Sequence, residues 1–199
     1  MSRWSKPATN EPSPLPWLDD PYFKLRPQPP TPQEEICSCR DDPPIKLMSL
    51  ALLSENPIHC LRCNQEVPPE RLRLDQSLVD AVAHWNRVYG AIDLLELDSG
   101  PYEAWARTQL LDPASPPNIE GLAVARKLNE IRRCYFWFFQ PNADDDYESP
   151  ALCPMCQESL RAYDEGLFPQ LLCENDSIVL EGGYRRHDDD DEDRGAARS

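Results

Sequence analysis

Glycine and histidine are scarce in this chain of 199 residues, which holds seven glycines and three histidines. The sequence contains no glycine-rich loop that could cradle a phosphate, no nucleophile elbow and no H-E-x-x-H metalloprotease motif. Two of the three histidines lie in sequence contexts without a partner, and we see no general base for acid–base catalysis. These absences predict that the protein is not an enzyme.

Long apolar runs are also missing. No stretch approaches the roughly 20 consecutive apolar residues that a membrane-spanning helix needs, and the N-terminus lacks the basic start and apolar run of a signal peptide. We therefore expect a cytoplasmic protein. In that compartment the eight cysteines are expected to be metal ligands or buried thiols rather than disulfides.

Basic side chains are outnumbered, with 20 lysines and arginines against 35 acidic residues and a net charge of -15. Proteins bind the phosphates of nucleic acids by displacing counterions with lysine and arginine. A chain this acidic is therefore expected to bind nucleic acid poorly and to be attracted to a basic protein partner. The composition leaves the oligomeric state open.

Proline is abundant, with 22 residues that concentrate near the N-terminus. Residues 1–40 have no helical or strand period and are predicted to form a proline-rich disordered arm. Residues 185–199 are predicted to form an acidic disordered tail, because adjacent like charges repel one another. Residues 41–184 then form a single domain.

A helical segment is predicted over residues 75–132. Asp75 suits the N-cap of a first helix, whose apolar residues recur every three or four positions, Trp85 among them. A second helix is expected to start near Pro101 and to place Trp105 on its apolar side. Asn118 is the expected N-cap of a third helix.

Short strands are predicted on both sides of this segment. The runs "CYFWFF" and "SIVL" suit buried strands, whereas "IKLMSLALLS" fits either a strand or a short helix. The whole pattern predicts an α+β fold, in which a zinc-knuckle or ribbon module contains a helical insertion and a few short strands and is flanked by disordered tails.

Two C-x-x-C pairs carry the most specific chemical signal. Cys60 and Cys63 lie in "IHCLRC", and Cys153 and Cys156 lie in "CPMC", about ninety residues later. Four thiolates can enclose one zinc ion tetrahedrally, and such a closed site is structural rather than catalytic. We predict one structural zinc ion bound by these four cysteines, with the helical segment inserted between the two halves of the site.

An alternative site is local to the C-terminal part. Cys173 and Asp176 follow "CPMC" at the spacing of a zinc ribbon, with a carboxylate at the position of the last thiolate. A third reading, in which neither pair binds a metal, also stays open. Cys37 and Cys39 are too close in sequence to form a knuckle and remain unassigned, and Cys134 is expected to be a small buried apolar residue.

The stretch from "HWNRVYGAIDLLELDSGPYEAWARTQLLDPASPPN" to "CPMC" resembles the bacterial zinc-ribbon proteins grouped as domain of unknown function 2310 (DUF2310). The likeness covers roughly residues 45 to 180 and is most specific in "DSGPYEAWA" and "QLLDPASPPN". This resemblance implies a zinc ribbon, an association with nucleic acid and no established reaction. It matches the cysteines of both C-x-x-C pairs to family cysteines, whereas a third family C-x-x-C appears here as Cys173 and Asp176.

The function that the sequence favours is a non-catalytic zinc-binding protein that acts by protein–protein interaction. An acidic immunity protein that neutralises a basic bacterial effector is a concrete version. The alternative is a zinc-ribbon nucleic-acid-binding regulator, and a purely structural subunit is a third reading. Nucleic-acid binding requires the basic clusters to gather on one face; they are Arg71 with Arg73, Arg126 with Lys127, Arg132 with Arg133, and Tyr184 to Arg186.

Overall fold

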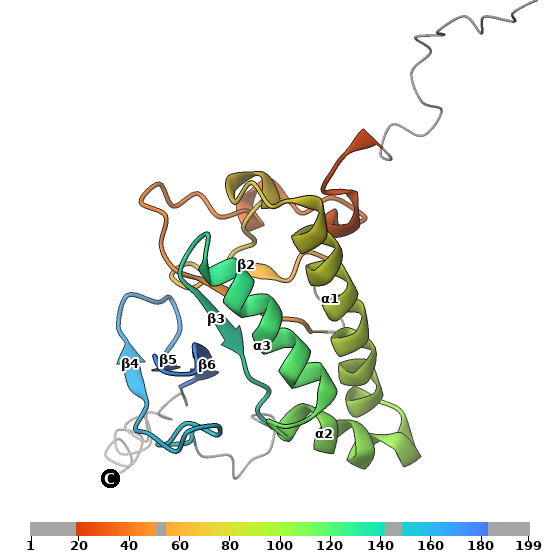
Figure 1. The fold of residues 1–199 in the computed structure, drawn as a ribbon, viewed down its shortest axis with the longest axis vertical. Helices are drawn as coiled ribbons and strands as arrows, with labels where there is room; N and C mark the ends of the chain where they lie inside the picture. The colour runs from red at the N-terminus through yellow and green to blue at the C-terminus, as the bar shows by residue number, and fades with distance from the viewer. Residues whose placement is uncertain (1–18, 51–54, 142–148, 183–199) are drawn as a thin grey trace, which may run out of the picture.

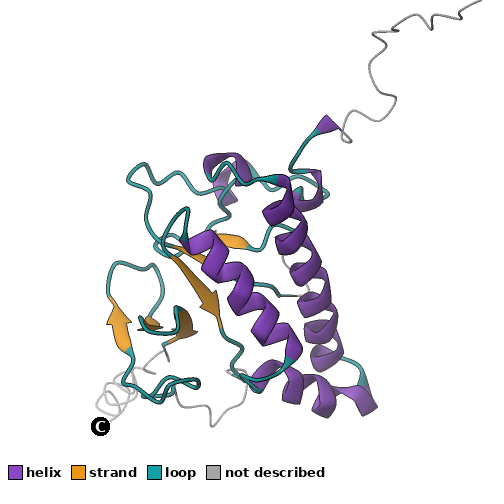
Figure 2. Ribbon diagram, in the orientation of Figure 1, coloured by secondary structure: helices purple, strands orange, loops and turns teal. Residues whose placement is uncertain are grey.

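A computed structural model of the chain describes residues 19–50, 55–141 and 149–182. Within these ranges, three α-helices lie on one side of a mixed six-stranded sheet, and much of the remaining chain is loop (Figure 1 and Figure 2). The predicted α+β class is confirmed. None of the helices described combines the length and the apolar character that crossing a bilayer requires. The predicted acidic tail, residues 185–199, lies outside the described residues.

Helix α1 (Gln76–Leu97) is the longest of these helices, and it begins where the sequence predicts. The Asp75 side chain caps it by accepting a hydrogen bond of 2.8 Å from the backbone N–H of Leu78. Its apolar stripe is buried, and Trp85 and Tyr89 are fully enclosed. The first predicted helix, its cap and the burial of Trp85 are therefore confirmed.

Helix α2 (Glu103–Leu111) follows a 3-10 turn that contains Pro101. Ala106 and Leu110 are its buried residues, whereas the Trp105 side chain is 51% exposed. The prediction that Trp105 faces the core is wrong. Neighbouring residues of a helix point about 100° apart, so a helix that packs through Ala106 and Leu110 turns Trp105 toward solvent.

Helix α3 (Pro116–Asn129) begins after Ser115, so the prediction of Asn118 as its N-cap is also wrong. Asn118 is fully buried, and its amide donates hydrogen bonds of 2.9 Å to the carbonyls of Leu110 and Asp112. These carbonyls lie at the end of helix α2, where backbone carbonyls lack partners within the helix. Asn118 therefore joins the end of one helix to the start of the next.

The sheet has the strand order β2-β1-β3-β6-β5-β4. Strand β1 is parallel to β3, β3 is parallel to β6, and the other neighbours are antiparallel. The predicted strands in "CYFWFF" and "SIVL" are confirmed, and "IKL" is a strand rather than a helix. The bounds are Ile45–Leu47 for β1, Ile58–Cys60 for β2, Cys134–Trp137 for β3, Arg161–Tyr163 for β4, Gln170–Cys173 for β5 and Ile178–Glu181 for β6.

The helices cover one face of this sheet. The Phe136 ring on β3 lies 5.8 Å from Trp85 and 6.2 Å from Tyr89 between ring centroids, which places Phe136 beneath α1. Helix α3 approaches closely because Gly121 has no side chain: a Cβ atom there would lie 2.3 Å from the Phe136 ring. Residues next to Phe136 and to its register partner Leu47 point to the opposite face.

The predicted disordered arm requires a correction for residues 19–40. Leu25 is fully buried in the core, and the Lys24 ammonium pairs with Asp80 of α1 at 2.8 Å. Asp20 pairs with Arg26 at 2.7 Å. The absence of a helical or strand period does not prevent packing, because an irregular segment can bury single side chains and satisfy its polar groups locally. Residues 1–18 lie outside the described residues.

Candidate metal centres

The first candidate metal centre contains four cysteines from two segments. The sulfur atoms of Cys37, Cys39, Cys60 and Cys63 all lie within 4.8 Å of one another. Cys60 ends strand β2, and Cys63 lies in the turn that follows. The backbone N–H of Cys37 donates to the Glu66 carbonyl at 2.8 Å, so the N-terminal segment lies against the chain just beyond this turn.

The second candidate centre contains Cys153, Cys156, Cys173 and Asp176, and its donor atoms also lie within 4.8 Å of one another. The Asp176 Oδ2 atom is 3.2 Å from the Cys153 sulfur and 3.5 Å from the Cys173 sulfur. The sulfurs of Cys156 and Cys173 are 3.6 Å apart. Zinc–sulfur bonds of about 2.3 Å give ligand separations of about 3.8 Å in a tetrahedron, so this cluster is close to the size of a zinc site.

The turns in the two centres share one backbone conformation. The residue four positions after Cys60, Cys153 or Cys173 has a left-handed backbone in each case. These residues are Asn64, Gln157 and Ser177, with φ of 61°, 61° and 54°. The N–H of Asn64 donates to the Cys60 carbonyl at 2.9 Å, and that of Gln157 donates to the Cys153 carbonyl at 3.0 Å. The two C-x-x-C turns are therefore built in the same way.

Several N–H groups point at the sulfurs. The amide of Met155 lies 3.4 Å from the Cys153 sulfur, and the amide of Asp176 lies 3.5 Å from the Cys173 sulfur. In the first centre, the Arg71 guanidinium lies 3.6 Å from the Cys37 sulfur. Such donors stabilise thiolates, which are the metal-binding form of cysteine.

The cysteines of the first centre differ in the direction of their pKa shifts. Burial works to raise the pKa of Cys37, but hydrogen bonds from the Cys39 backbone and from the thiols of Cys63 and Cys60 lower it below its ordinary value. Burial raises the pKa of both Cys60 and Cys63. In the absence of a metal ion, one thiolate is thus stabilised by neighbouring thiols, and a bound cation would favour ionisation of the others.

The second centre combines thiols with a carboxylate. Burial would raise the pKa of Asp176, but hydrogen bonds from Cys156, Cys153 and Cys173 hold it below its ordinary value. Burial raises the pKa of Cys153. The carboxylate is therefore ionised and supplies a fourth donor beside three sulfurs. Both donor sets fit a metal ion that accepts sulfur and oxygen ligands.

The predicted single site is corrected by this arrangement. The pair Cys60 and Cys63 belongs to one centre, and the pair Cys153 and Cys156 belongs to the other. Strand β2 is at one edge of the sheet, whereas β4 and β5 lie beyond β3 and β6. Cys60 ends β2 and Cys153 and Cys156 precede β4, so the two pairs lie next to different parts of the sheet. The alternative pair, Cys173 and Asp176, joins the local ribbon.

The contribution of Cys37 and Cys39 was missed because their spacing differs from that of a knuckle. A usable signal was present in the sequence. Once the C-terminal residues complete a four-donor ribbon, the pair Cys60 and Cys63 needs two further donors, and the preceding C-x-C supplies them. The remaining cysteine, Cys134, is fully buried in β3, as predicted.

Neither histidine among the described residues belongs to these clusters. His59 is 8% exposed, and its Nδ1 lies 3.2 Å from the Asn64 carbonyl, so it is a packed neighbour of the first centre. His84 is exposed on α1, with Nε2 3.7 Å from a carboxylate oxygen of Glu120.

Three arginines of the predicted basic clusters contact carboxylates. The Asp42 carboxylate accepts hydrogen bonds from Arg71 and Arg132, which belong to two different clusters. The Glu174 carboxylate, near the second centre, accepts from Arg133. The pairs are Arg71 with Asp42 at 3.2 Å, Arg132 with Asp42 at 2.6 Å, and Arg133 with Glu174. The cluster at Tyr184 to Arg186 lies outside the described residues. Arg71, Arg132 and Arg133 are therefore largely neutralised locally.

No family model, curated protein or solved structure matches this chain. The resemblance to the DUF2310 proteins therefore stays a prediction. The two candidate metal centres stand on the donor atoms and geometry of this chain alone: four thiols in one case, and three thiols with a carboxylate in the other.

Proposed function

We propose that this protein is a non-catalytic zinc-binding protein that acts in the cytoplasm by binding a basic protein partner. The observation that carries the proposal is the presence of two clusters with four donors each. Four protein ligands fill a tetrahedral zinc shell, whereas a catalytic zinc keeps a position open for water or substrate. Both ions would then be structural.

The donor atoms support zinc as the metal. Seven of the eight are cysteine sulfurs, which are soft ligands and disfavour magnesium and calcium. Zinc accepts both tetrahedral thiolate sets and sets that include one carboxylate. It also has no redox chemistry of its own, which agrees with a structural role.

Two structural ions would stabilise a sheet made of short strands. The six strands are three or four residues long, which is below the usual length of about five or six. An ion in the first centre would fasten the N-terminal segment to the end of β2. An ion in the second would join the turn before β4 to the β5–β6 turn. Each ion would close a loop and so reduce the entropy of the unfolded chain.

The partner is inferred from charge and exposed aromatic surface. The chain carries a net charge of -15, which favours a cationic partner. Where α1 ends and α2 begins, the side chains of Leu97, Tyr102 and Trp105 are 54%, 61% and 51% exposed. Exposed tyrosine and tryptophan are frequent anchors of protein interfaces. Asp98 and Glu103 lie in the same segment, so the surface suits a basic partner with an apolar centre, such as a bacterial effector that this protein neutralises.

The test is co-purification of the tagged full chain from its native host at low and high salt, followed by mass spectrometry and reconstitution with the purified candidate. We expect a basic protein whose binding weakens as salt rises, and which is lost in the double variant Tyr102→Ala, Trp105→Ala. Ile119→Ala is the matched control, because Ile119 is 56% exposed on a different helix.

Nucleic acid is tested separately by anisotropy titration with single-stranded and duplex DNA and RNA. We expect little binding at physiological salt. Tight binding that weakens steeply with salt would contradict the proposal and support the nucleic-acid-binding alternative, because it would mean that local arginines outweigh the overall charge.

A further inference from the structure

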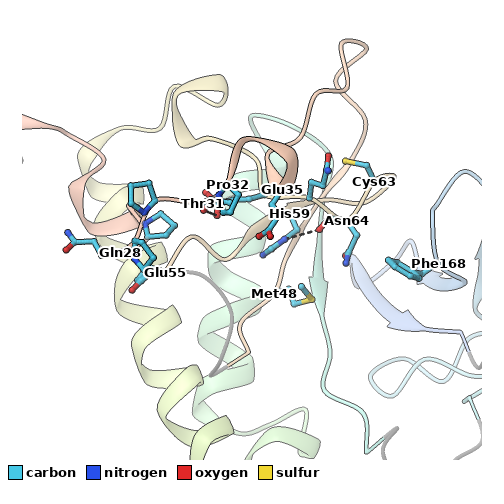
Figure 3. Close-up of a pocket in the computed structure, with 15 residues that line it drawn as sticks. Gln28, Thr31, Pro32, Glu35, Met48, Glu55, His59, Cys63, Asn64 and Phe168 are labelled. Carbon is cyan, nitrogen blue, oxygen red and sulfur yellow. Dashed lines mark hydrogen bonds between the residues drawn. The ribbon is translucent and has the colours of Figure 1, made fainter.

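A cavity of about 570 Å³ lies beside the first candidate metal centre, with Cys63 in its wall (Figure 3). Residues 27–32 of the N-terminal segment line one side, and strand β2 and the turn that follows it line another. Figure 3 shows Glu55 at one end of the lining residues, Phe168 at the other, and His59 between them. Sites for small ligands have volumes of roughly 300 to 1,000 Å³, so the cavity has the size of a binding site.

The cavity wall contains a buried histidine with one unpartnered nitrogen. His59 is 8% exposed, and its Nδ1 lies 3.2 Å from the Asn64 carbonyl. A carbonyl oxygen only accepts, so Nδ1 carries the hydrogen, and in the uncharged ring that prevails at neutral pH Nε2 is an acceptor. Nε2 has no hydrogen bond to any residue within 19–50, 55–141 and 149–182. It is not one of the unpartnered side-chain atoms that solvent cannot reach, so a ligand can donate to it.

Negative charge predominates around this nitrogen. Glu35, Glu55 and Glu66 line the cavity, whereas no lysine or arginine does so among the residues that the structure describes. Glu66 already accepts hydrogen bonds from Thr31 and Asn56, so it contributes charge to the wall rather than a free oxygen. Glu35 is exposed, and its carboxylate makes no hydrogen bond or ion pair within the described ranges. The wall therefore offers an available carboxylate as well as an imidazole acceptor.

A guanidinium group complements these acceptors. It is a cation with five N–H donors in one plane, so it can donate to an imidazole nitrogen and to a carboxylate together, whereas an ammonium is a compact, strongly hydrated charge. The methylenes of an arginine also suit the apolar part of the wall, where Met48 lies. Lys46, the register partner of His59, opposes a cation, but it lines the adjoining smaller cavity, and three glutamates outnumber it.

We propose that this cavity binds the guanidinium group of an arginine, which donates to Nε2 of His59 and to the Glu35 carboxylate, with its methylenes toward Met48. Free arginine and an arginine side chain of a peptide carry the same chemistry, and the test separates these two sources. The site does not depend on the proposed function, because it shares no residue with the exposed surface on α2 and uses no metal ion.

The test is a nuclear magnetic resonance titration of the full chain, as purified with its metal and labelled with nitrogen-15 in histidine. The probes are free arginine, arginine capped at both ends, and lysine capped at both ends. We expect arginine to shift the His59 Nε2 signal saturably, because a donor engages its lone pair, and capped lysine to bind at least about fivefold more weakly than capped arginine. Tighter binding of free arginine identifies the small molecule as the source, and tighter binding of the capped form identifies a peptide side chain.

Two adjacent glutamates provide matched variants. Glu35→Gln should weaken arginine binding by about fivefold, the upper value for a partly exposed ion pair. Glu34→Gln is the control, because it removes the same charge from the same 3-10 turn, and Glu34 does not line the cavity. The proposal is overturned if arginine leaves the His59 signal of the wild-type protein unchanged, if capped lysine binds as tightly as capped arginine, or if the two variants lose binding equally.

Discussion

The Oδ2 atom of Asp176 lies 3.2 Å from the sulfur of Cys153 and 3.5 Å from that of Cys173. The carboxylate thus occupies the fourth position of a C-x-x-C…C-x-x-D ribbon. Oxygen is a harder ligand than thiolate, and four sulfurs form the softer cage. In our account, the second centre therefore holds zinc less tightly than the four-cysteine centre does.

Replacing Asp176 by cysteine should strengthen the second site. We expect Asp176→Cys to slow zinc release to a chromogenic chelator roughly tenfold or more, because metal affinity follows ligand type. Asp176→Ala should accelerate release of the same ion. The other zinc ion should keep its release rate in both variants. An unchanged release profile in Asp176→Cys would mean that residue 176 does not contact the metal.

The two helical tryptophans should differ in their effect on stability. Trp85 is fully buried, and its Nε1 donates to the Pro117 carbonyl at 3.1 Å. We expect Trp85→Ala to lower the free energy of unfolding by about 3–5 kcal/mol, because it leaves a large cavity. Trp105→Ala should change it by less than about 1 kcal/mol. Urea denaturation measures both values, and equal losses would show that Trp105 is also packed.

The N-terminal segment should contribute to stability. Leu25 is fully buried, whereas its neighbour Lys24 makes a half-exposed ion pair with Asp80. We expect Leu25→Ala to cost about 2–5 kcal/mol of unfolding free energy. Lys24→Ala, the matched control, should cost less than about 1 kcal/mol, as surface ion pairs do. If Leu25→Ala unfolds like the wild type, the segment does not pack in solution.

The buried lysine should make stability depend on pH. Lys46, the central residue of β1, is 4% exposed, and burial lowers its pKa to about 8 in the folded state from an ordinary value of 10.5. Between these values the unfolded chain binds more protons than the folded chain, so stability contributed by this group rises with pH. We expect Lys46→Met to be more stable than the wild type at pH 7, by on the order of 1–3 kcal/mol, and the difference to shrink toward pH 10. The cysteines are present in both proteins, so their contribution to the difference largely cancels. A difference that stays constant across this range would contradict the burial of the Lys46 ammonium.

Local patterns in the sequence were sufficient for much of the fold. The cap at Asp75 and the apolar period through Trp85 are properties of neighbouring residues, and both were confirmed. Side-chain direction in α2 was not accessible in this way. A nine-residue helix has too few turns to define a stripe, and the tertiary contacts of Ala106 and Leu110 determined that Trp105 is exposed.

The metal centres show the same division between local and long-range information. The turns at Cys60 and Cys153 were recognisable from spacing alone. Their partners were not, because the choice depends on the strand order of the sheet and on an irregular N-terminal segment that brings Cys37 to β2. Spacing rules describe single turns, whereas the grouping of turns is a property of the whole fold.

The most direct test of the account is the zinc content of the purified full chain, measured by native mass spectrometry with elemental analysis. We expect two zinc ions per chain, one for each cluster. The double variant Cys37→Ser, Cys39→Ser should retain one ion, and Cys173→Ser should retain the other. A single zinc ion that survives both of these changes, and is lost when Cys60 and Cys63 are replaced by serine, would contradict two separate centres.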